Sequence, residues 1–220
     1  MTPQMTTLER QSSQIEESLA RLPTRLAAAF AAAAAERQVP NYAAYVDRSG
    51  RGNLETLVRV LQHLWDDLEY PSGQKELLRA DFKQCESLAQ DDGRYENGWR
   101  FAKNAIRSTQ HAIRLWMEGE VGDGVWASDL AIDTLYTSTA IPIDDVQMRT
   151  ISWDEHEELI ASPLVQAEYR RQRHDLADLT AGEGTDSDQQ EAVSKVRRRA
   201  QTDALRFLDR DAAAKSLDLT

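Results

Sequence analysis

The sequence predicts an all-α protein, a single-domain bundle of about seven to nine helices. In most segments apolar residues recur three and four positions apart, the spacing that places side chains on one face of a helix. Strand-like alternation of β-branched residues is almost absent, and Pro142 interrupts the nearest candidate, residues 139–143. Six prolines and ten glycines are few for 220 residues, and most of them fall between the periodic segments.

The first two predicted helices flank a proline. A helix is expected over residues 7–21, and Pro23 either ends it or opens the next helix as its first residue, because proline lacks an amide hydrogen. The second helix, over residues 24–37, consists mostly of alanine. Alanine has the highest helix propensity, and its small side chain lets neighbouring helices approach closely. We therefore expect this helix in the interior of the bundle.

The most regular helical face follows a short break in the chain. Residues 39–42 are expected to end the alanine-rich helix, with Asn41 capping a short turn, and Asn53 is expected to cap the next helix. That helix carries an uninterrupted apolar face. Its members are Leu54, Leu57, Val58, Leu61, Leu64, Trp65 and Leu68.

The second half of the chain predicts further helices separated by glycine-containing turns. They are expected over about residues 74–90, 95–118, 125–140 and 152–179, with a loop at 119–124. Ser152 and Glu155 match a capping box, and the last of these helices is expected to pause at Ser162 and Pro163. In domain terms, residues 1–181 form the helical domain, 182–188 an acidic flexible linker, and 189–213 a C-terminal helix that packs on the same domain.

The charge balance favours one class of partner over others. The chain has 26 basic and 37 acidic residues, so its formal net charge is -11. Such a charge repels phosphate backbones and anionic lipid, so neither nucleic acid nor membrane is expected as a partner. It favours a basic protein partner, although the same charge is also explained by solubility alone.

Cysteine content and the N-terminal sequence predict a cytoplasmic location. Cys85 is the only cysteine, so an intramolecular disulfide and a thiolate metal cluster are excluded. Charged residues precede the first apolar run, unlike a secretory signal, and the apolar run 26–35 is too short to span a bilayer.

Three patches of the sequence together resemble a known bacterial family. The first is Glu36-Arg37 followed by Pro40-Asn41-Tyr42, and the second is the helix with Leu61 and Trp65. The third comprises Glu157-Glu158-Leu159, Pro163-Leu164-Val165, Glu168 and Gln172. Their order and approximate spacing are similar to the YjaG-like family of uncharacterised bacterial proteins, over roughly residues 20 to 180. The resemblance implies an all-α fold and no known reaction. The C-terminus departs from the family, because residues 215–220 replace its Asn-Ile-Gly-Ile-type ending.

Within these patches, four residues are candidates for ligand binding: Tyr42, Trp65, Glu168 and Gln172. For each of them, a purely structural role is the alternative explanation. The two aromatic residues lie where a core side chain is expected. The carboxylate and the amide are four residues apart on one helical face, so they are expected to hydrogen-bond either to each other or to a neighbouring backbone.

Motifs for catalysis and for metal binding are absent from the sequence. Glu-x-x-His pairs, His-Glu-x-x-His, Gly-x-Ser-x-Gly and phosphate-binding loops do not occur. His63, Asp66 and Asp67 are weak metal candidates, and a solvated helix face is the more common explanation of such a triplet. No catalytic residue, cofactor or metal is therefore assigned. Two basic clusters, 170–174 and 197–199, are expected to form solvated helix faces; the alternative is that they pair with acidic helices of the same fold or with acidic groups of another chain.

Two functions remain open at this point. The leading one is a non-catalytic acidic protein-interaction domain that binds a basic partner, as an immunity protein does. The alternative is a helical domain with a buried small-molecule or metal site, catalytic or sensory. Its walls would be Trp65, Trp99, Trp116 or Tyr42, with Glu168, Gln172 or His63 as polar groups. A homodimer is also open, since the alanine-rich helix and the N-terminal helix each offer an apolar face.

Overall fold

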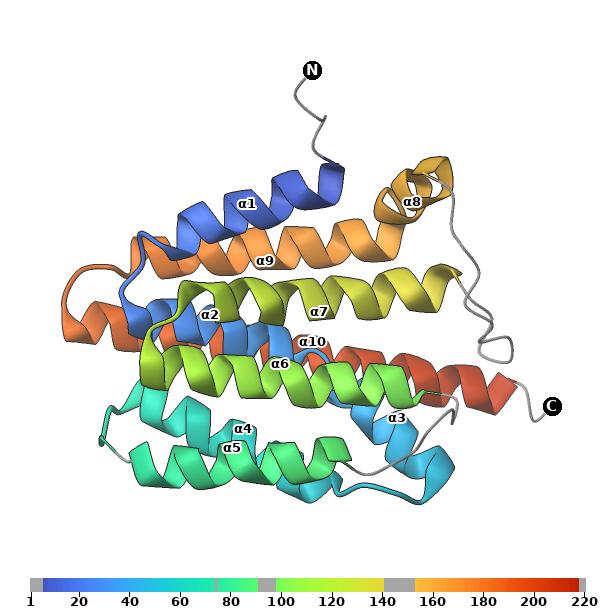
Figure 1. The fold of residues 1–220 in the computed structure, drawn as a ribbon, viewed down its shortest axis with the longest axis horizontal. Helices are drawn as coiled ribbons and strands as arrows, with labels where there is room; N and C mark the ends of the chain where they lie inside the picture. The colour runs from blue at the N-terminus through green and yellow to red at the C-terminus, as the bar shows by residue number, and fades with distance from the viewer. Residues whose placement is uncertain (1–5, 74, 91–97, 141–152, 218–220) are drawn as a thin grey trace.

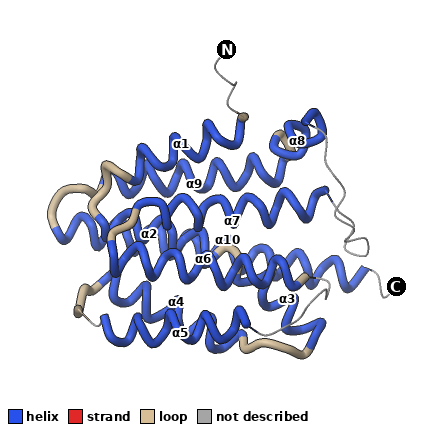
Figure 2. The backbone as a smooth tube through the Cα atoms, in the orientation of Figure 1, coloured by secondary structure: helices blue, strands red, loops and turns tan. Residues whose placement is uncertain are grey.

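The computed structural model describes residues 6–73, 75–90, 98–140 and 153–217, and these residues form helices joined by short connections (Figures 1 and 2). The helices are α1 (Thr7–Leu19), α2 (Thr24–Glu36), α3 (Val39–Ser49), α4 (Leu54–Glu69), α5 (Lys75–Gln90), α6 (Trp99–Glu118), α7 (Val121–Ala140), α8 (Trp153–Ile160), α9 (Pro163–Ala181) and α10 (Asp186–Leu217). The described residues contain no strand, so the predicted all-α class is confirmed. No helix in these ranges is both long and apolar enough to cross a membrane.

Helix α2 lies at the centre of the bundle. It packs against α4, α6, α7, α9 and α10. Figure 1 shows the long helices side by side along the longest axis, with α1 and α8 along one edge and α4 and α5 along the other. An apolar cluster fills the space around α2 and includes residues from every other described helix except α8.

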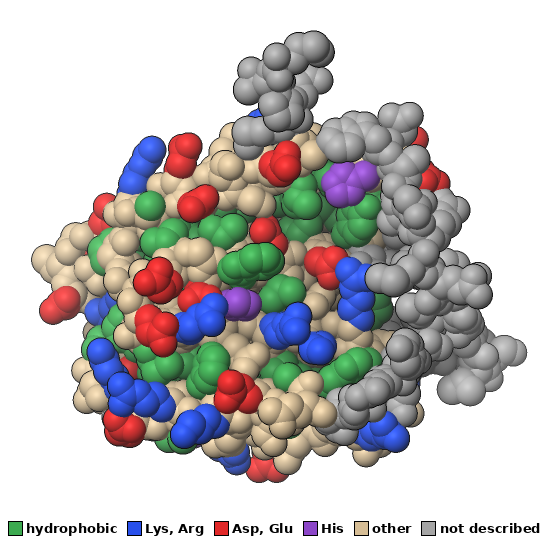
Figure 3. Space-filling model, viewed as in Figure 1, with side chains coloured by type: hydrophobic (Ala, Val, Ile, Leu, Met, Phe, Trp, Pro, Cys, Tyr) green, Lys and Arg blue, Asp and Glu red, His purple; other side chains and the backbone are tan. Residues whose placement is uncertain are grey.

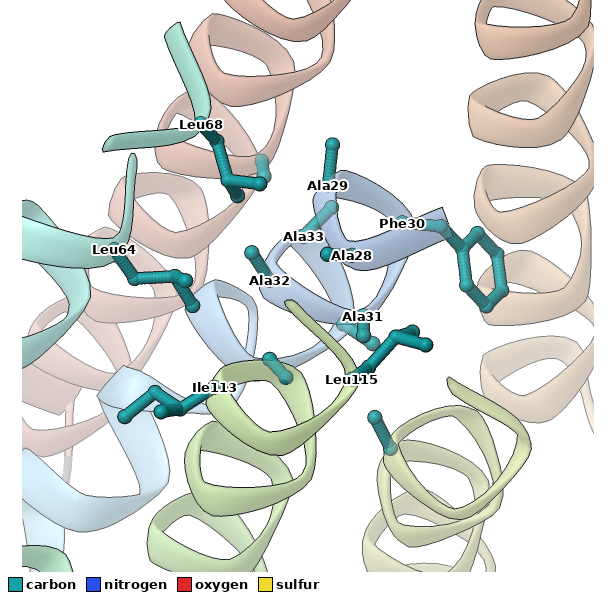
Figure 4. Close-up of a cluster of buried hydrophobic side chains, with 14 of the residues drawn as sticks. Ala28, Ala29, Phe30, Ala31, Ala32, Ala33, Leu64, Leu68, Ile113 and Leu115 are labelled. Carbon is teal, nitrogen blue, oxygen red and sulfur yellow. The ribbon is translucent and has the colours of Figure 1, made fainter. Parts of the chain in front are cut away.

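Alanine allows α2 to occupy this central position. Every residue from Leu26 to Ala35 is at most 1% exposed, so the prediction of an interior helix is confirmed. Figure 4 shows the alanine methyl groups against Leu64 of α4 and Leu115 of α6. Because methyl side chains bring helix axes close together, five helices fit around one. Helix α2 therefore has no exposed apolar face that a second copy of the chain could cover.

The predicted break after α2 is shorter than expected. Residues 39–49 form the complete helix α3, which Pro40 opens within its first turn. Proline is compatible with this position because the first amides of a helix have no intrahelical acceptor. Asn41 therefore lies inside α3 and is not a cap. Asn53 does cap α4, accepting a hydrogen bond from the Thr56 amide at 3.0 Å, as predicted.

The predicted loop 119–124 is wrong in its second half, because α7 already begins at Val121. The glycines that indicated a loop have other roles: Gly119 ends α6 in the left-handed conformation, and Gly124 lies in a close helix contact. A Cβ atom on Gly124 would lie 2.7 Å from Leu19 and 3.1 Å from Leu115. Glycine at this position therefore lets α7 approach α1 and α6 closely.

The C-terminal helices differ from the prediction mainly in their limits. Ser162 caps α9 by accepting from the Val165 amide, which confirms the expected pause. Helix α10 begins at Asp186, so the connection that follows α9 is only residues 182–185, and α10 packs on α2 and α9. The capping box predicted at Ser152 lies outside the described residues.

Candidate functional site

Two buried carboxylates meet an arginine at the C-terminal end of α2. Arg37, 4% exposed, donates from Nε to Glu168 Oε1 at 2.9 Å and from Nη1 to Asp175 Oδ2 at 2.7 Å. Its Nη2 lies 2.9 Å from the same Glu168 oxygen, outside hydrogen-bond geometry. Both carboxylates come from α9, one and three turns into the helix, where they face α2.

Further hydrogen bonds connect this group to two more helices. Arg199 of α10 donates to Asp175 Oδ1 from Nε at 3.0 Å and from Nη2 at 2.6 Å. Gln172 Nε2 donates to Glu168 Oε1 at 3.3 Å, so the predicted hydrogen bond between these two residues is confirmed. Ser128 Oγ of α7 donates to Gln172 Oε1 at 2.9 Å. We call Arg37, Glu168, Gln172, Asp175 and Arg199 the polar centre.

The polar centre is balanced in charge and is buried except for Arg199, whose side chain is 19% exposed. Burial by itself would lower the pKa of the Arg37 guanidinium, but Glu168 and Asp175 outweigh it, and the net shift is upward. Each carboxylate therefore faces a permanently charged arginine. Beside Arg37 and Gln38 lies a cavity of about 30 Å³. This volume holds a water molecule but no larger ligand.

The aromatic candidates Tyr42 and Trp65 lie in the core. Both are completely buried. Trp65 Nε1 donates to Glu36 Oε2 at 3.0 Å, and the Tyr42 hydroxyl accepts from the Asn53 amide at 3.0 Å. The three sequence patches therefore converge: the first meets the second through Glu36 and the third through Arg37.

The weak metal candidates point to different partners. His63 Nδ1 lies 3.0 Å from Asp81 of α5, and Asp66 lies 3.0 Å from Arg197. Asp67 accepts from Trp116 Nε1 at 2.7 Å. The structure thus does not bring the three together. Across the described ranges, no group of three or more His, Cys, Asp or Glu residues could hold a metal ion.

The basic clusters are paired within the fold at several positions. Arg197 lies 2.6 Å from Glu69 of α4, and Arg199 contacts both Asp175 and Asp178. Arg171 reaches Asp203 of α10 at 3.4 Å. These pairs fix α10 against α4 and α9, so the expected solvated face is wrong for Arg171, Arg197 and Arg199, and the intramolecular alternative holds for them.

An open groove lies between α1, α7 and α8, with a volume of about 500 Å³. Figure 3 shows acidic side chains around an apolar area over α1 and α7. The lining residues are apolar, acidic or otherwise polar, and no lysine or arginine is among them. We call this site the acidic groove; it is lined by Leu8, Glu9, Ser12, Ser13, Glu16, Asp129, Ile132, Asp133, Tyr136, His156 and Ile160.

The carboxylates of the acidic groove differ in their partners. Asp133 pairs with Arg100 at 2.8 Å, and Glu9 accepts from the Thr6 amide in the capping box of α1. Among the described residues, Asp129 accepts a side-chain hydrogen bond from Ser12 Oγ alone, at 2.9 Å. Burial raises the pKa of the Asp129 carboxyl, and the Ser12 hydrogen bond opposes this shift in part. Within the described part of the chain, neither Asp129 nor Glu16 has a basic partner.

Sequence reasoning did not find the acidic groove. Ser12 and Asp129, which hydrogen-bond across it, are 117 positions apart in the chain. The sequence contains a weak signal of two polar helix faces. Ser12 and Glu16 form one pair of polar residues four positions apart, and Asp129 and Asp133 form another. Each pair lies beside an apolar residue on a helix. Only the packing of α1 on α7 turns these two faces into one groove.

The family model described as "Protein of unknown function (DUF416)" matches residues 14–205, from α1 into α10. The chain belongs to the DUF416 family. The crystal structure of a DUF416 family protein from Shewanella baltica OS155 superposes on this DUF416 chain with a TM-score of 0.71 and 18% sequence identity. The similarity covers 84% of this chain and 92% of that one, and at this identity it concerns the fold alone. No curated protein matches the chain.

Glu36 gives this DUF416 protein a specific pH dependence. Burial raises the pKa of the Glu36 carboxyl above its ordinary 4.5, and the Trp65 hydrogen bond and the Arg197 charge oppose the shift. The folded state therefore holds this proton more tightly than the unfolded chain. Its contribution to the free energy of unfolding falls as pH rises from 4.5 through the folded pKa. We expect Glu36→Gln to remove this decline, measured by urea unfolding across that pH interval. Glu86→Gln, at an exposed position of α5, is the control; parallel curves for Glu36→Gln and the parent would contradict the expectation.

Proposed function

We propose that this DUF416 protein is a non-catalytic interaction domain whose acidic groove binds a basic segment of a partner protein. The observation that carries the proposal is the groove itself, in which carboxylates surround an apolar floor and no lysine or arginine lines the wall. The net charge of -11 adds long-range attraction for a basic partner.

The chemistry of the groove defines what such a segment must contain. Asp129 is partly buried, and a lysine or arginine from a partner would supply the opposite charge that it lacks among the described residues. The floor, from Ile132 and Ile160, belongs to a separate apolar cluster beneath α1 and α8. The fitting segment therefore alternates basic and apolar side chains, as in a basic amphipathic helix. A protein that neutralises a basic toxin, such as an immunity protein, presents a surface of this kind.

The acidic groove has more support than a buried small-molecule or metal site. The polar atoms of Trp65, Glu168 and Gln172 have hydrogen-bond partners within the fold. The cavity beside Glu168 has a volume of about 30 Å³, against about 500 Å³ for the groove. Ligand pockets for small molecules usually measure about 300–1,000 Å³.

The proposal includes a location and a subgroup, both supported by the sequence. The single cysteine, Cys85, favours the reducing environment of the bacterial cytoplasm. Within the DUF416 family, the Glu36-Arg37 and Pro40-Asn41-Tyr42 patches support a YjaG-like subgroup. A homodimer that forms through the exposed side of α1 would cover the same edge of the bundle as a basic partner. The binding experiment below distinguishes these two alternatives.

The test uses charge changes at the two groove carboxylates that lack a basic partner. The double variant Glu16→Lys, Asp129→Asn is compared with Glu17→Lys, which places a lysine on the same helix outside the groove. Tagged protein is recovered from its own cells at low and high salt, and bound proteins are identified by mass spectrometry. A synthetic helix with lysines and leucines on one face is titrated in parallel, with a glutamate-leucine helix as the negative control.

We expect a basic partner that dissociates at high salt and binds the double variant about tenfold more weakly, a difference of roughly 1.4 kcal/mol. Glu17→Lys is expected to bind nearly as the parent does, because it leaves the groove unchanged. Equal binding by both variants would exclude the acidic groove as the site. Concentration-dependent dimerisation lost only in the double variant would assign this edge to a second copy instead.

A further inference from the structure

A second hollow, on the face formed by α6 and α7, has the opposite electrostatic character. Its volume is about 340 Å³. Arg107, His111 and Arg114 line it from α6, spaced four and three apart so that they share one face of the helix. Trp126 and Leu130, one turn apart on α7, form the opposite wall. Figure 3 shows a histidine between basic side chains near the middle of this face.

A buried carboxylate holds two of these side chains in place. Asp123, 3% exposed, accepts from Arg114 Nε at 2.7 Å and lies 2.7 Å from His111 Nδ1. Burial lowers the pKa of the His111 imidazole, and the hydrogen bond and charge of Asp123 oppose this shift. The imidazole is therefore neutral at pH 7, and Asp123 compensates only Arg114.

Arg107 leaves the hollow with a positive charge in excess. Its side chain is exposed, and no ion pair joins it to any described residue. Such a free guanidinium on a protein with a net charge of -11 is a local binding point for an anion. Polyanions such as nucleic acid are repelled by the whole protein, so a small ligand with one anionic group fits better.

Trp126 supplies the flat surface that completes the hollow. The indole is 59% exposed, although tryptophan is usually buried. It stacks on the His111 ring with an interplanar angle of 17° and a centroid distance of 6.2 Å, which fixes its orientation. A planar ring can lie against the free part of this indole while its anionic group reaches the guanidinium of Arg107.

We propose that this hollow binds a small molecule that carries one flat aromatic ring and one anionic group, a carboxylate or a phosphate monoester. Arg107 binds the anionic group, Trp126 stacks on the ring, and Asp123 is a positioning residue that orients Arg114 and His111. This site is separate from the acidic groove, because the two share no lining residue. Either proposal can therefore fail without the other.

The test follows the indole N–H signal of Trp126 by NMR during titration, with Trp126→Phe identifying the signal. The probes are benzoate and phenyl phosphate; phenol, benzylammonium and inorganic phosphate test the ring and the charge separately. Arg107→Gln removes the free guanidinium, and Lys103→Gln removes an equal charge from the same helix outside the hollow. Both changes are at solvent-accessible positions, so both variants are expected to fold.

We expect at least one of the two ring-bearing anions to shift the Trp126 signal with a Kd of about 1 mM or tighter. Arg107→Gln is expected to weaken binding at least about tenfold, and Lys103→Gln by less than about twofold. No shift with either anion would overturn the proposal. Equal binding of phenol or benzylammonium would show that the hollow is only an apolar surface. Shifts of the Trp126 signal that depend on protein concentration alone would assign the hollow to self-association. Each of these two results would overturn the proposal.

Discussion

Replacing Arg37 by methionine is expected to lower the free energy of unfolding by about 3–5 kcal/mol. The methionine side chain has a similar length but carries no charge. Glu168 and the Oδ2 atom of Asp175 are then buried without the cation that they face in the parent protein. Breaking one partner of a buried ion pair costs more than the pair itself contributes, because the remaining charge stays desolvated. Urea unfolding followed by circular dichroism measures the effect.

Two further variants separate lost charge compensation from lost packing. Arg170→Met, at an exposed position of α9, is expected to change stability by less than about 0.5 kcal/mol. Adding Glu168→Gln and Asp175→Asn to Arg37→Met removes the uncompensated charges and is expected to recover part of the loss. A destabilisation below about 1 kcal/mol for Arg37→Met would contradict the role assigned to the polar centre.

Trp65→Ala is expected to destabilise the protein by about 3–5 kcal/mol. The indole is completely buried between α4 and its neighbours, so truncation leaves a large cavity in the core. It also removes the donor to Glu36, which is then left half-buried with one hydrogen bond fewer. Thermal and urea unfolding report the loss, and recovery of stability by an added small apolar molecule would indicate that the cavity stays open.

Trp65→Phe isolates the hydrogen bond from the bulk of the side chain. The aromatic ring still fills most of the space, but Glu36 loses the Trp65 Nε1 donor, which at present opposes the upward shift of its pKa. We expect a smaller loss of stability, about 1–3 kcal/mol, that grows as pH rises. A loss equal to that of Trp65→Ala, with no pH dependence, would show that shape alone determines the contribution of Trp65.

Local signals in the sequence predicted the helices well where packing reinforced them. The apolar face of α4 is an example: Leu57, Leu61, Leu64, Trp65 and Leu68 are all buried as predicted, whereas Val58 is 47% exposed. Periodicity identified the face, but its width depends on which helices approach it, and in this fold Val60 is buried instead.

Proline and glycine misled the prediction at two places. The sequence predicts that Pro40 breaks a helix, but this residue opens α3. It also predicts a loop that contains Gly122 and Gly124, but both residues lie within α7. In both cases the residue is compatible with a helix for reasons beyond its intrinsic propensity. Pro40 lies where no amide donor is needed, and Gly124 lies where a neighbouring helix leaves no space for a Cβ atom.

The sequence by itself determined the all-α class, the buried position of the alanine-rich helix and the shared helix face of Glu168 and Gln172, because each depends on residues close together in the chain. Only the tertiary structure decided that Glu168 pairs with Arg37, 131 positions away, and that Ser12 meets Asp129 in the acidic groove. Helical periodicity states which residues share a face but not which helix that face meets. The partner of each face follows from the way the described helices pack around α2, and so do the acidic groove and the hollow beside Trp126.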